Sequence, residues 1–214
     1  MYVTNGYRSP RIRAQHPGRA GTEYRTIAPT RPPVRAPSAA RCGEARGMLR
    51  PMSREFAIEF VCGDGETEFF RVSSRGHPMI RGVNVEGRER ITEVWPLLAD
   101  GHYHFVVRGA RGLLREFRGV MPSDCAALYE AQLVFDDVEN PAAGLRIANF
   151  GANEGVVVIK DLRSGEEASA TVTPDEVFEW HPRTPASHYD YCITSIEQPW
   201  LRWRFAGRGR GYPT

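Results

Sequence analysis

The chain has 214 residues, of which 41% are hydrophobic, which is enough for a packed core in one large domain or two small ones. Residues 1–50 hold ten Arg and two Glu, whereas residues 51–214 hold 18 Lys or Arg and 24 Asp or Glu. The basic charge therefore belongs to an N-terminal segment. The longest purely aliphatic run, Val156–Ile159, is far too short for a transmembrane segment.

The N-terminal segment is rich in Arg and Pro and has no apolar periodicity, so we expect residues 1–52 to be a disordered tail. It contains no apolar stretch of the kind a secretory signal needs. Met48 and Met52 stand just before the first expected strand, and either is a possible start of translation. We therefore expect residues 1–47 to be dispensable for folding.

From residue 53 onward, short alternating apolar segments are separated by turn residues, and no window shows a helical period over ten residues. This pattern is typical of antiparallel β-sandwiches. The first expected unit covers residues 53–121, with strands at Phe56–Phe60, Thr67–Val72, Val83–Val85, Ile91–Trp95, His102–Val107 and Leu113–Phe117. After a linker at Pro122–Asp124, the second covers residues 125–208, with strands at Ala131–Phe135, Leu145–Phe150, Val156–Lys160, Ala168–Val172, Val177–Trp180, His188–Thr194 and Leu201–Phe205.

The two units repeat the same landmarks at nearly constant offsets. Trp95 and Trp180 lie 85 residues apart, Tyr103 and Tyr189 lie 86 apart, and the pairs Phe117/Phe205 and Gly119/Gly207 lie 88 apart. The chain is therefore interpreted as two copies of one immunoglobulin-like sandwich, all-β in class. The first copy is expected to lack its opening strand, because only the Arg/Pro segment precedes Phe56.

Structural roles follow for these landmarks. Each tyrosine begins a penultimate strand after a turn, where a tyrosine corner places its ring in the core and bonds its hydroxyl to the upstream backbone. The tryptophans are expected in the core on the preceding strand.

The stretch "YHFVVRGARGLLREFRG" (103–119) resembles the closing hairpin of the C-terminal domain of bacterial phospholipase C of the phosphatidylcholine-preferring type. The matching positions are Tyr103, Gly109, Gly112, Arg115, Phe117 and Gly119 in the first copy, Tyr189, Asp190, Phe205 and Gly207 in the second, and Asn149 and Gly151 in "LRIANFG". The resemblance covers residues 54–208, and it implies a tandem pair of such domains. It departs from the family at His104, at Ala110-Arg111 and at "IEQPW", which puts a shared loop-based ligand site in doubt.

In that family catalysis belongs to a long N-terminal domain with metal-binding carboxylates and histidines. The resemblance therefore implies a phospholipase C C-terminal region without its catalytic domain, so no catalytic residue, metal or cofactor is assigned. No Gly-x-Ser-x-Gly, phosphate-cradling loop or His-Glu-x-x-His is found.

Four arginines surround two glycines in the first hairpin, and a guanidinium can bond two phosphate oxygens at once. These candidates for a lipid-headgroup or anion contact are Arg108, Arg111, Arg115 and Arg118. An ordinary solvated hairpin remains the alternative, and Arg115 shares a strand face with Phe117, so it is also a candidate for a packed structural role.

Three weaker candidates for binding sites are two clusters of possible metal ligands and the C-terminal stretch. His102 and His104 with Asp100 have metal-ligating side chains, and Asp136, Asp137, Glu139 and Asn140 have calcium-type oxygens, but surface positions explain both sets. "GRGRGY" (207–212) is a frayed terminus rather than a nucleic-acid tail, and no nucleic-acid partner is expected. One disulfide among Cys42, Cys62, Cys125 and Cys192 is possible, but its pairing is open.

Three functions remain open. The first is an accessory module that contacts a phospholipid surface or a phospholipase C catalytic domain. The second is a fragment or enzyme that takes part in phosphodiester hydrolysis of phosphatidylcholine. The third is a cell-surface interaction protein without a lipid role. The cellular compartment is not determined, since the family is largely secreted and this chain shows no export signal.

Overall fold

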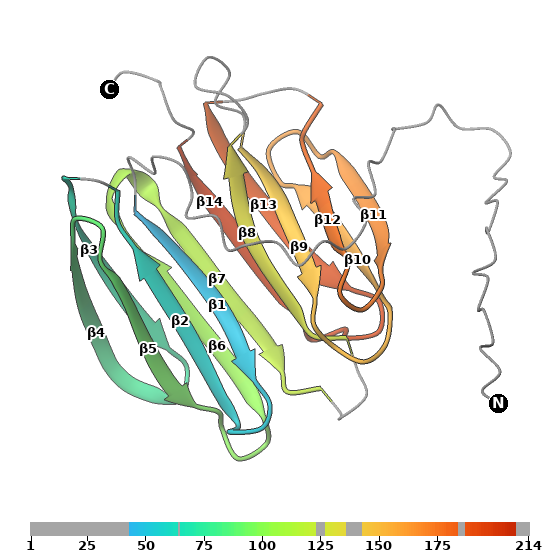
Figure 1. Cartoon of the computed structure of the whole chain (residues 1–214), viewed down its shortest axis with the longest axis horizontal. Coiled ribbons are helices and arrows are strands. Elements are labelled where there is room, and N and C mark those ends of the chain that lie inside the picture. Colours follow the sequence, from blue (N-terminus) through green and yellow to red (C-terminus); the bar gives the residue numbers. More distant parts are fainter. Residues whose placement is uncertain (1–42, 64, 123–126, 136–142, 184–186, 209–214) are drawn as a thin grey trace, which may run out of the picture.

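The computed structural model describes residues 43–63, 65–122, 127–135, 143–183 and 187–208 (Figure 1). The fold is all-β, as the sequence predicts, and the described part contains no α-helix and one short 3-10 turn, η1 (Ala110–Gly112). No helix of the described residues is both long and apolar enough to cross a membrane.

The strands follow the two-part organisation of the sequence. The first half contains β1 (Glu44–Arg50), β2 (Glu55–Val61), β3 (Thr67–Ser74), β4 (His77–Glu86), β5 (Arg90–Pro96), β6 (His102–Arg108) and β7 (Leu114–Val120). The second half contains β8 (Tyr129–Phe135), β9 (Ala143–Asn149), β10 (Gly155–Asp161), β11 (Glu167–Val172), β12 (Val177–Trp180), β13 (His188–Ser195) and β14 (Arg202–Arg208).

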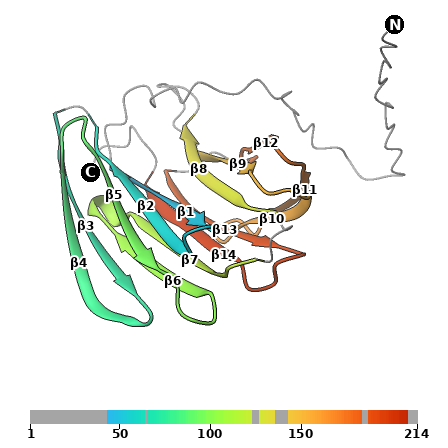
Figure 2. The ribbon, with the colours of Figure 1, turned by 60° about the horizontal axis from the view of Figure 1, so that its bottom comes forward.

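One large sheet runs through both halves, in the order β11-β10-β13-β14-β7-β6-β3-β4. Two three-stranded sheets, β1-β2-β5 and β12-β9-β8, cover one of its faces (Figure 2). Each half therefore supplies the same seven strands in the same order: four to the large sheet and three to a covering sheet. The interpretation of each half as an immunoglobulin-like sandwich, and the division at 53–121 and 125–208, stay predictions.

The two halves join where β7 and β14 pair in antiparallel fashion. Glu116 lies opposite Arg204 in this pair, Phe117 lies opposite Trp203, and Arg115 lies opposite Phe205. Because Phe117 and Phe205 are repeat equivalents, this register is symmetric about the Glu116–Arg204 pair. The halves are related by an approximate two-fold rotation, in which Arg115 corresponds to Trp203.

The core lies between the large sheet and its covering sheets, and aromatic side chains fill it. The Phe56 ring of β2 stacks on Tyr103 with centroids 4.7 Å apart, and the Trp180 ring of β12 meets Tyr191 edge-on at 5.0 Å. Alternate residues of each large-sheet strand point into this layer, which is why the period-2 pattern was visible in the sequence.

The expected absence of an opening strand in the first half is wrong, and so is the extent of the disordered tail. Residues 44–50 form β1, which pairs with β2 from Glu44↔Val61 to Arg50↔Glu55. The two buried residues of β1 are Ala45 and Gly47, and a Cβ on Gly47 would lie 2.6 Å from the Phe56 ring. The rings of Phe56 and Phe117 occupy the space that a side chain at Gly47 would need. A small residue is therefore required there, and the strand shows no clear alternation of large apolar residues in the sequence. Residues 1–42 lie outside the described part.

The pairing of β1 argues against the expected dispensability of residues 1–47, because their removal would take the first four residues, 44–47, out of a paired strand. A sheet strand contributes both hydrogen bonds and packing, so its loss destabilises the fold.

Candidate functional site

Arg115 does not belong to any surface cluster, which corrects one of the four expected anion contacts. Its side chain is completely buried on the inner face of β7. The guanidinium forms a two-pronged ion pair with Glu44, with Nε–Oε1 2.8 Å and Nη2–Oε2 2.9 Å, and Nη1 donates to the carbonyl of Ala206 at 2.9 Å. The alternative of a structural role, visible from the face that Arg115 shares with Phe117, fits this environment.

Burial alone would lower the pKa of Arg115, but the adjacent Glu44 carboxylate and the Tyr189 hydroxyl outweigh burial and raise it. Arg115 therefore stays charged in the folded chain, and the charge is satisfied internally. A cation held in this way is not available to a ligand in solution.

The hydroxyl groups of the two repeated tyrosines each accept a hydrogen bond from the other half. The Tyr103 hydroxyl accepts a hydrogen bond from Trp203 Nε1 at 3.4 Å, and the Tyr189 hydroxyl accepts one from Arg115 Nη2 at 3.0 Å. Burial raises the pKa of Tyr103, with the Trp203 hydrogen bond opposing this effect. Each tyrosine ring lies in the core, as expected, and its hydroxyl joins the two repeats; the tyrosine-corner bond to the upstream backbone stays a prediction.

The remaining landmarks also lie in the core. Gly119 and Gly207 each stand beneath the tyrosine ring of their own half, and a Cβ on Gly207 would lie 2.6 Å from the Tyr189 hydroxyl oxygen. The buried members of the set are Trp95, Phe117, Trp180 and Phe205.

The other three expected arginines are exposed, and Arg118 lies at the opposite end of the β6–β7 pair from Arg108. Arg108 projects from the outer face of the large sheet at the end of β6, and Arg118 lies on the same face of β7, opposite Arg202 of β14. Arg111 lies in the η1 turn, where its Nη2 is 3.9 Å from Glu66 Oε1. The structure therefore removes Arg115 from the predicted cluster and places Arg118 at the other end of the sheet, while a shared anion contact of Arg108 and Arg111 stays a prediction.

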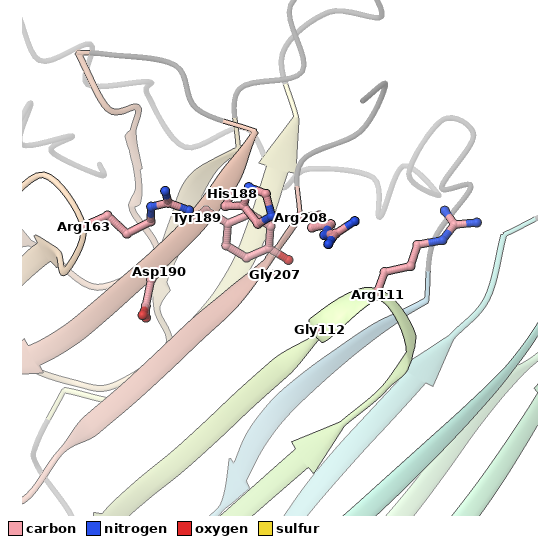
Figure 3. Close-up of a pocket in the computed structure, with 8 residues that line it drawn as sticks. All are labelled: Arg111, Gly112, Arg163, His188, Tyr189, Asp190, Gly207 and Arg208. Carbon is pink, nitrogen blue, oxygen red and sulfur yellow. The ribbon is translucent and has the colours of Figure 1, made fainter. Parts of the chain in front are cut away.

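Arg111 instead borders an open cavity of about 730 Å³ with residues the sequence interpretation had not grouped with it. We call the end of the molecule that holds this cavity the Arg111 end. The lining contains Arg111, Gly112, Arg163, His188, Tyr189, Asp190, Gly207 and Arg208 (Figure 3). The long basic side chains come from η1, from the β10–β11 turn and from the end of β14.

The opposite end carries exposed apolar side chains on loop tips. We call it the Trp200 end. Four loops lie at this end, 51–54 and 97–101 from the first half and 150–154 and 196–201 from the second, towards the bottom and lower right of the ribbon in Figure 1. The exposed large side chains are Met52, Phe150, Ile196 and Trp200.

Hydrogen bonds and ring contacts connect these loops. Leu97 N donates to the Arg54 carbonyl at 2.9 Å, and Leu98 N donates to the His102 carbonyl at 3.2 Å. The His102 ring lies 6.2 Å from Trp200. Ile196 N donates to the Val156 carbonyl at 3.1 Å, which places the 150–154 loop beside it.

Of the weaker metal candidates, His104 pairs with a residue outside the set, and His102 lies near Asp100. His104 Nε2 lies 2.9 Å from Glu116 Oε1, and His102 lies 3.9 Å from Asp100. Within the described ranges, no three His, Cys, Asp or Glu side chains are grouped to hold a metal ion. The calcium candidates at 136, 137, 139 and 140 lie outside the described residues.

Sequence reasoning missed the Arg111-end cavity and the Trp200 end for the same reason. Arg163, His188 and Arg208 come from segments that only the sheet pairing brings to Arg111, and the four apolar tips come from four separate turns. The sequence held one weak signal for the Trp200 end. Trp200 stands in a turn, in "EQPWL", where a large apolar side chain does not belong to any expected core strand.

Comparison with known proteins shows a partial likeness to phospholipase C. The chain is 30% identical over 134 residues to a non-hemolytic phospholipase C of Pseudomonas aeruginosa, covering 58% of this chain and 19% of that protein. The chain therefore spans about a fifth of the relative it matches. No family model matches the chain. A phospholipase C-like relationship is supported for this region of the relative.

Proposed function

We propose that this chain is a non-catalytic accessory module, a tandem pair of β-sandwiches that serves phospholipid breakdown by holding onto a phospholipid bilayer through its Trp200 end. The observation that carries the proposal is the placement of Met52, Phe150, Ile196 and Trp200, all exposed, on loop tips at one end of the molecule. The partial likeness to a phospholipase C supports a lipid surface, rather than another protein, as the occupant.

Loop tips are suited to this contact because they can enter the bilayer without exposing unpaired strand backbone to it. A tryptophan is favoured at the boundary between headgroups and acyl chains, since its ring is apolar and its N–H is polar. Isolated apolar side chains at an interface contribute binding in proportion to the area they bury.

Charge makes a smaller contribution at this end. Arg54, Arg118 and Arg202 are exposed there, but Asp100 and Glu154 are exposed on the same loops. With both signs present, we expect binding to phosphatidylcholine vesicles that changes little between low and high salt. A contact made mainly by arginines would weaken strongly with salt.

The test is co-sedimentation of the full chain with phosphatidylcholine vesicles. Trp200→Ser and Ile196→Ser are each expected to weaken vesicle partitioning about tenfold or more, because each removes a large apolar side chain from the contact. The matched control is Phe69→Ser: Phe69 is exposed to nearly the same degree as Trp200 (57% against 60%) but lies on the large sheet.

Trp200 also provides a direct signal. The other three tryptophans, Trp95, Trp180 and Trp203, are buried, so Trp200 is the solvent-exposed indole. Vesicles should shift its emission to the blue and protect it from acrylamide. Absence of vesicle binding at any salt concentration, or equal losses in Phe69→Ser and Trp200→Ser, would overturn the lipid contact and favour docking on a catalytic domain.

A further inference from the structure

We propose that two copies of this chain associate through β4, a free edge of the large sheet, so that the sheet continues from one copy into the other. β4 is the last strand in the order of that sheet, and none of the described strands pairs with its other side. Figures 1 and 2 show it along the outer margin of the first half. An edge strand directs a row of backbone N–H and C=O groups outward, and these groups can pair with a further strand.

The β4 edge carries exposed apolar side chains. Ile80, within β4, is 63% exposed, and Phe69, on the neighbouring β3, is 57% exposed. The Phe69 ring reaches over the edge strand, since a Cβ on Gly82 would lie 2.8 Å from it. Large apolar side chains beside an unpaired edge leave the solvent when another strand is added, which favours association.

The second half shows that the fold does not require such an edge. β11 stands in the place of β4 at the other end of the large sheet. It has six residues against the ten of β4, and its exposed positions are Glu167, Ser169 and Thr171. Short, polar edge strands resist unwanted pairing. One of two equivalent edges is therefore protected, whereas the other is long and apolar, and a binding surface explains that difference.

Features that hinder edge pairing lie at the beginning of β4. Pro78 has no backbone N–H, and the register with β3 is irregular beside it. Arg81 forms an ion pair with Glu93 of β5, so its charge is compensated within the chain. From Arg81 to Glu86 the pairing with β3 is regular, and this stretch is the part of the edge that we assign to the contact.

A second copy is the partner whose edge fits. The two halves of this chain already join in this manner, by antiparallel pairing of β7 with β14 about an approximate two-fold axis. Antiparallel pairing of β4 with itself can be centred on Gly82. Ile80 then lies opposite the second copy's Asn84. Arg81 lies opposite the second copy's Val83, so like charges do not face each other. A two-fold contact of this kind closes after two copies and gives a dimer rather than a fibre.

The dimer does not alter the bilayer contact, in an argument that rests on the proposed function. Because the two β4 strands run in opposite directions, the Trp200 ends of the two copies point in opposite directions. One bilayer therefore meets one Trp200 end of a dimer, as it does for a monomer. Phe69→Ser remains a valid control in the vesicle experiment, although it should also weaken the dimer.

Sedimentation velocity of the full chain over a concentration series measures the association. We expect a reversible equilibrium between the monomer and a species of twice its mass. Ile80→Ser should raise the dimer dissociation constant at least about tenfold, because the apolar side chain is lost from both copies. The matched control is Ile196→Ser: Ile196 is exposed to nearly the same degree (66% against 63%) but lies at the Trp200 end. It should leave the dissociation constant unchanged.

Two sedimentation results would overturn the dimer through β4. One is a chain that stays monomeric up to about 100 μM. The other is a dimer that Ile196→Ser weakens as much as Ile80→Ser does, since the apolar loop tips of the Trp200 end would then form the contact. Ile80→Ser should partition onto vesicles as the unaltered chain does. Failure of the bilayer contact and failure of the dimer are therefore read separately.

Hydrogen–deuterium exchange of the unaltered chain locates the contact without any substitution. The amides of β4 should exchange more slowly at high than at low protein concentration, because a second strand protects them. The amides of β11, the equivalent free edge, should show no such dependence. Concentration-dependent protection in β11 or in the 196–201 loop, with none in β4, would contradict the assignment.

Discussion

The Arg115 guanidinium donates a hydrogen bond to the hydroxyl of Tyr189, 3.0 Å away, although the two residues are 74 positions apart and belong to different repeats. The two-fold counterpart of this contact is the bond from Trp203 to Tyr103, at 3.4 Å. The last strand of each half thus holds the tyrosine of the other half. Together with the β7–β14 pairing, these contacts make the two repeats one packed body.

Replacing Arg115 with Ala should lower the free energy of unfolding by about 3–5 kcal/mol, because the half-buried Glu44 carboxylate loses its cation. Arg115→Met, which keeps the volume but not the charge, should also destabilise, since Glu44 and Tyr189 both lose a donor. Urea unfolding followed by tryptophan fluorescence measures the effect. Arg108→Ala, at an exposed position, is the control and should change stability by less than about 0.5 kcal/mol. Similar values for both positions would contradict the buried network.

Unfolding of the chain should be a single cooperative transition, because the core contacts of one half include side chains of the other. Trp95 reports on the first half and Trp180 on the second. Proteins that keep only one of these tryptophans, with Phe at the others, should give the same denaturant midpoint. Two separate midpoints would show that the halves unfold independently.

Gly207→Ala should destabilise the chain by about 1–3 kcal/mol, since its Cβ would stand 2.6 Å from the Tyr189 hydroxyl oxygen in a packed core. In a Tyr189→Leu background the same substitution should cost less, because the clashing atom is gone. The double-mutant cycle measures this coupling. If the cost is equal in both backgrounds, the glycine is not required by the tyrosine.

Glu130→Gln should stabilise the chain at neutral pH. Burial, aided by the nearby Glu59 carboxylate, raises the pKa of Glu130 above its ordinary value, although Arg46 opposes this. The folded chain then holds the proton more tightly than the unfolded chain, so the stability of the natural protein falls as pH rises through this range. The gain in melting temperature for Glu130→Gln should therefore be full at pH 7 and shrink towards pH 4.

The control for that titration is Glu154→Gln, on the exposed 150–154 loop. It should leave the melting temperature unchanged at both pH values. A gain for Glu130→Gln that does not depend on pH would contradict the assignment to its raised pKa.

Alternation of apolar residues was sufficient to locate most strands, because the large sheet buries one face and leaves the other to solvent. β1 was missed because two of its inward positions are Ala45 and Gly47, and the small Gly47 leaves room for the rings of Phe56 and Phe117, so the strand has little apolar signal. Because Arg115 shares a strand face with Phe117, the sequence also offered a packed, inward-facing position for Arg115, and the structure has it there. Its partner Glu44 could not be identified, since it lies 71 residues away in a segment expected to be disordered.

The sequence by itself determined the all-β class, the two-fold repetition and the landmark residues, because each of these is recorded in local periodicity and in constant offsets along the chain. Tertiary structure decided that β14 pairs with β7 and that the tyrosines bond across the repeats. It also decided that Arg111 lines one cavity with Arg163 and Arg208, and that Trp200 lies at the same end of the molecule as the other apolar tips. These relationships join residues far apart in the chain. They depend on which strands pair and in which register, and local sequence patterns carry no record of that choice.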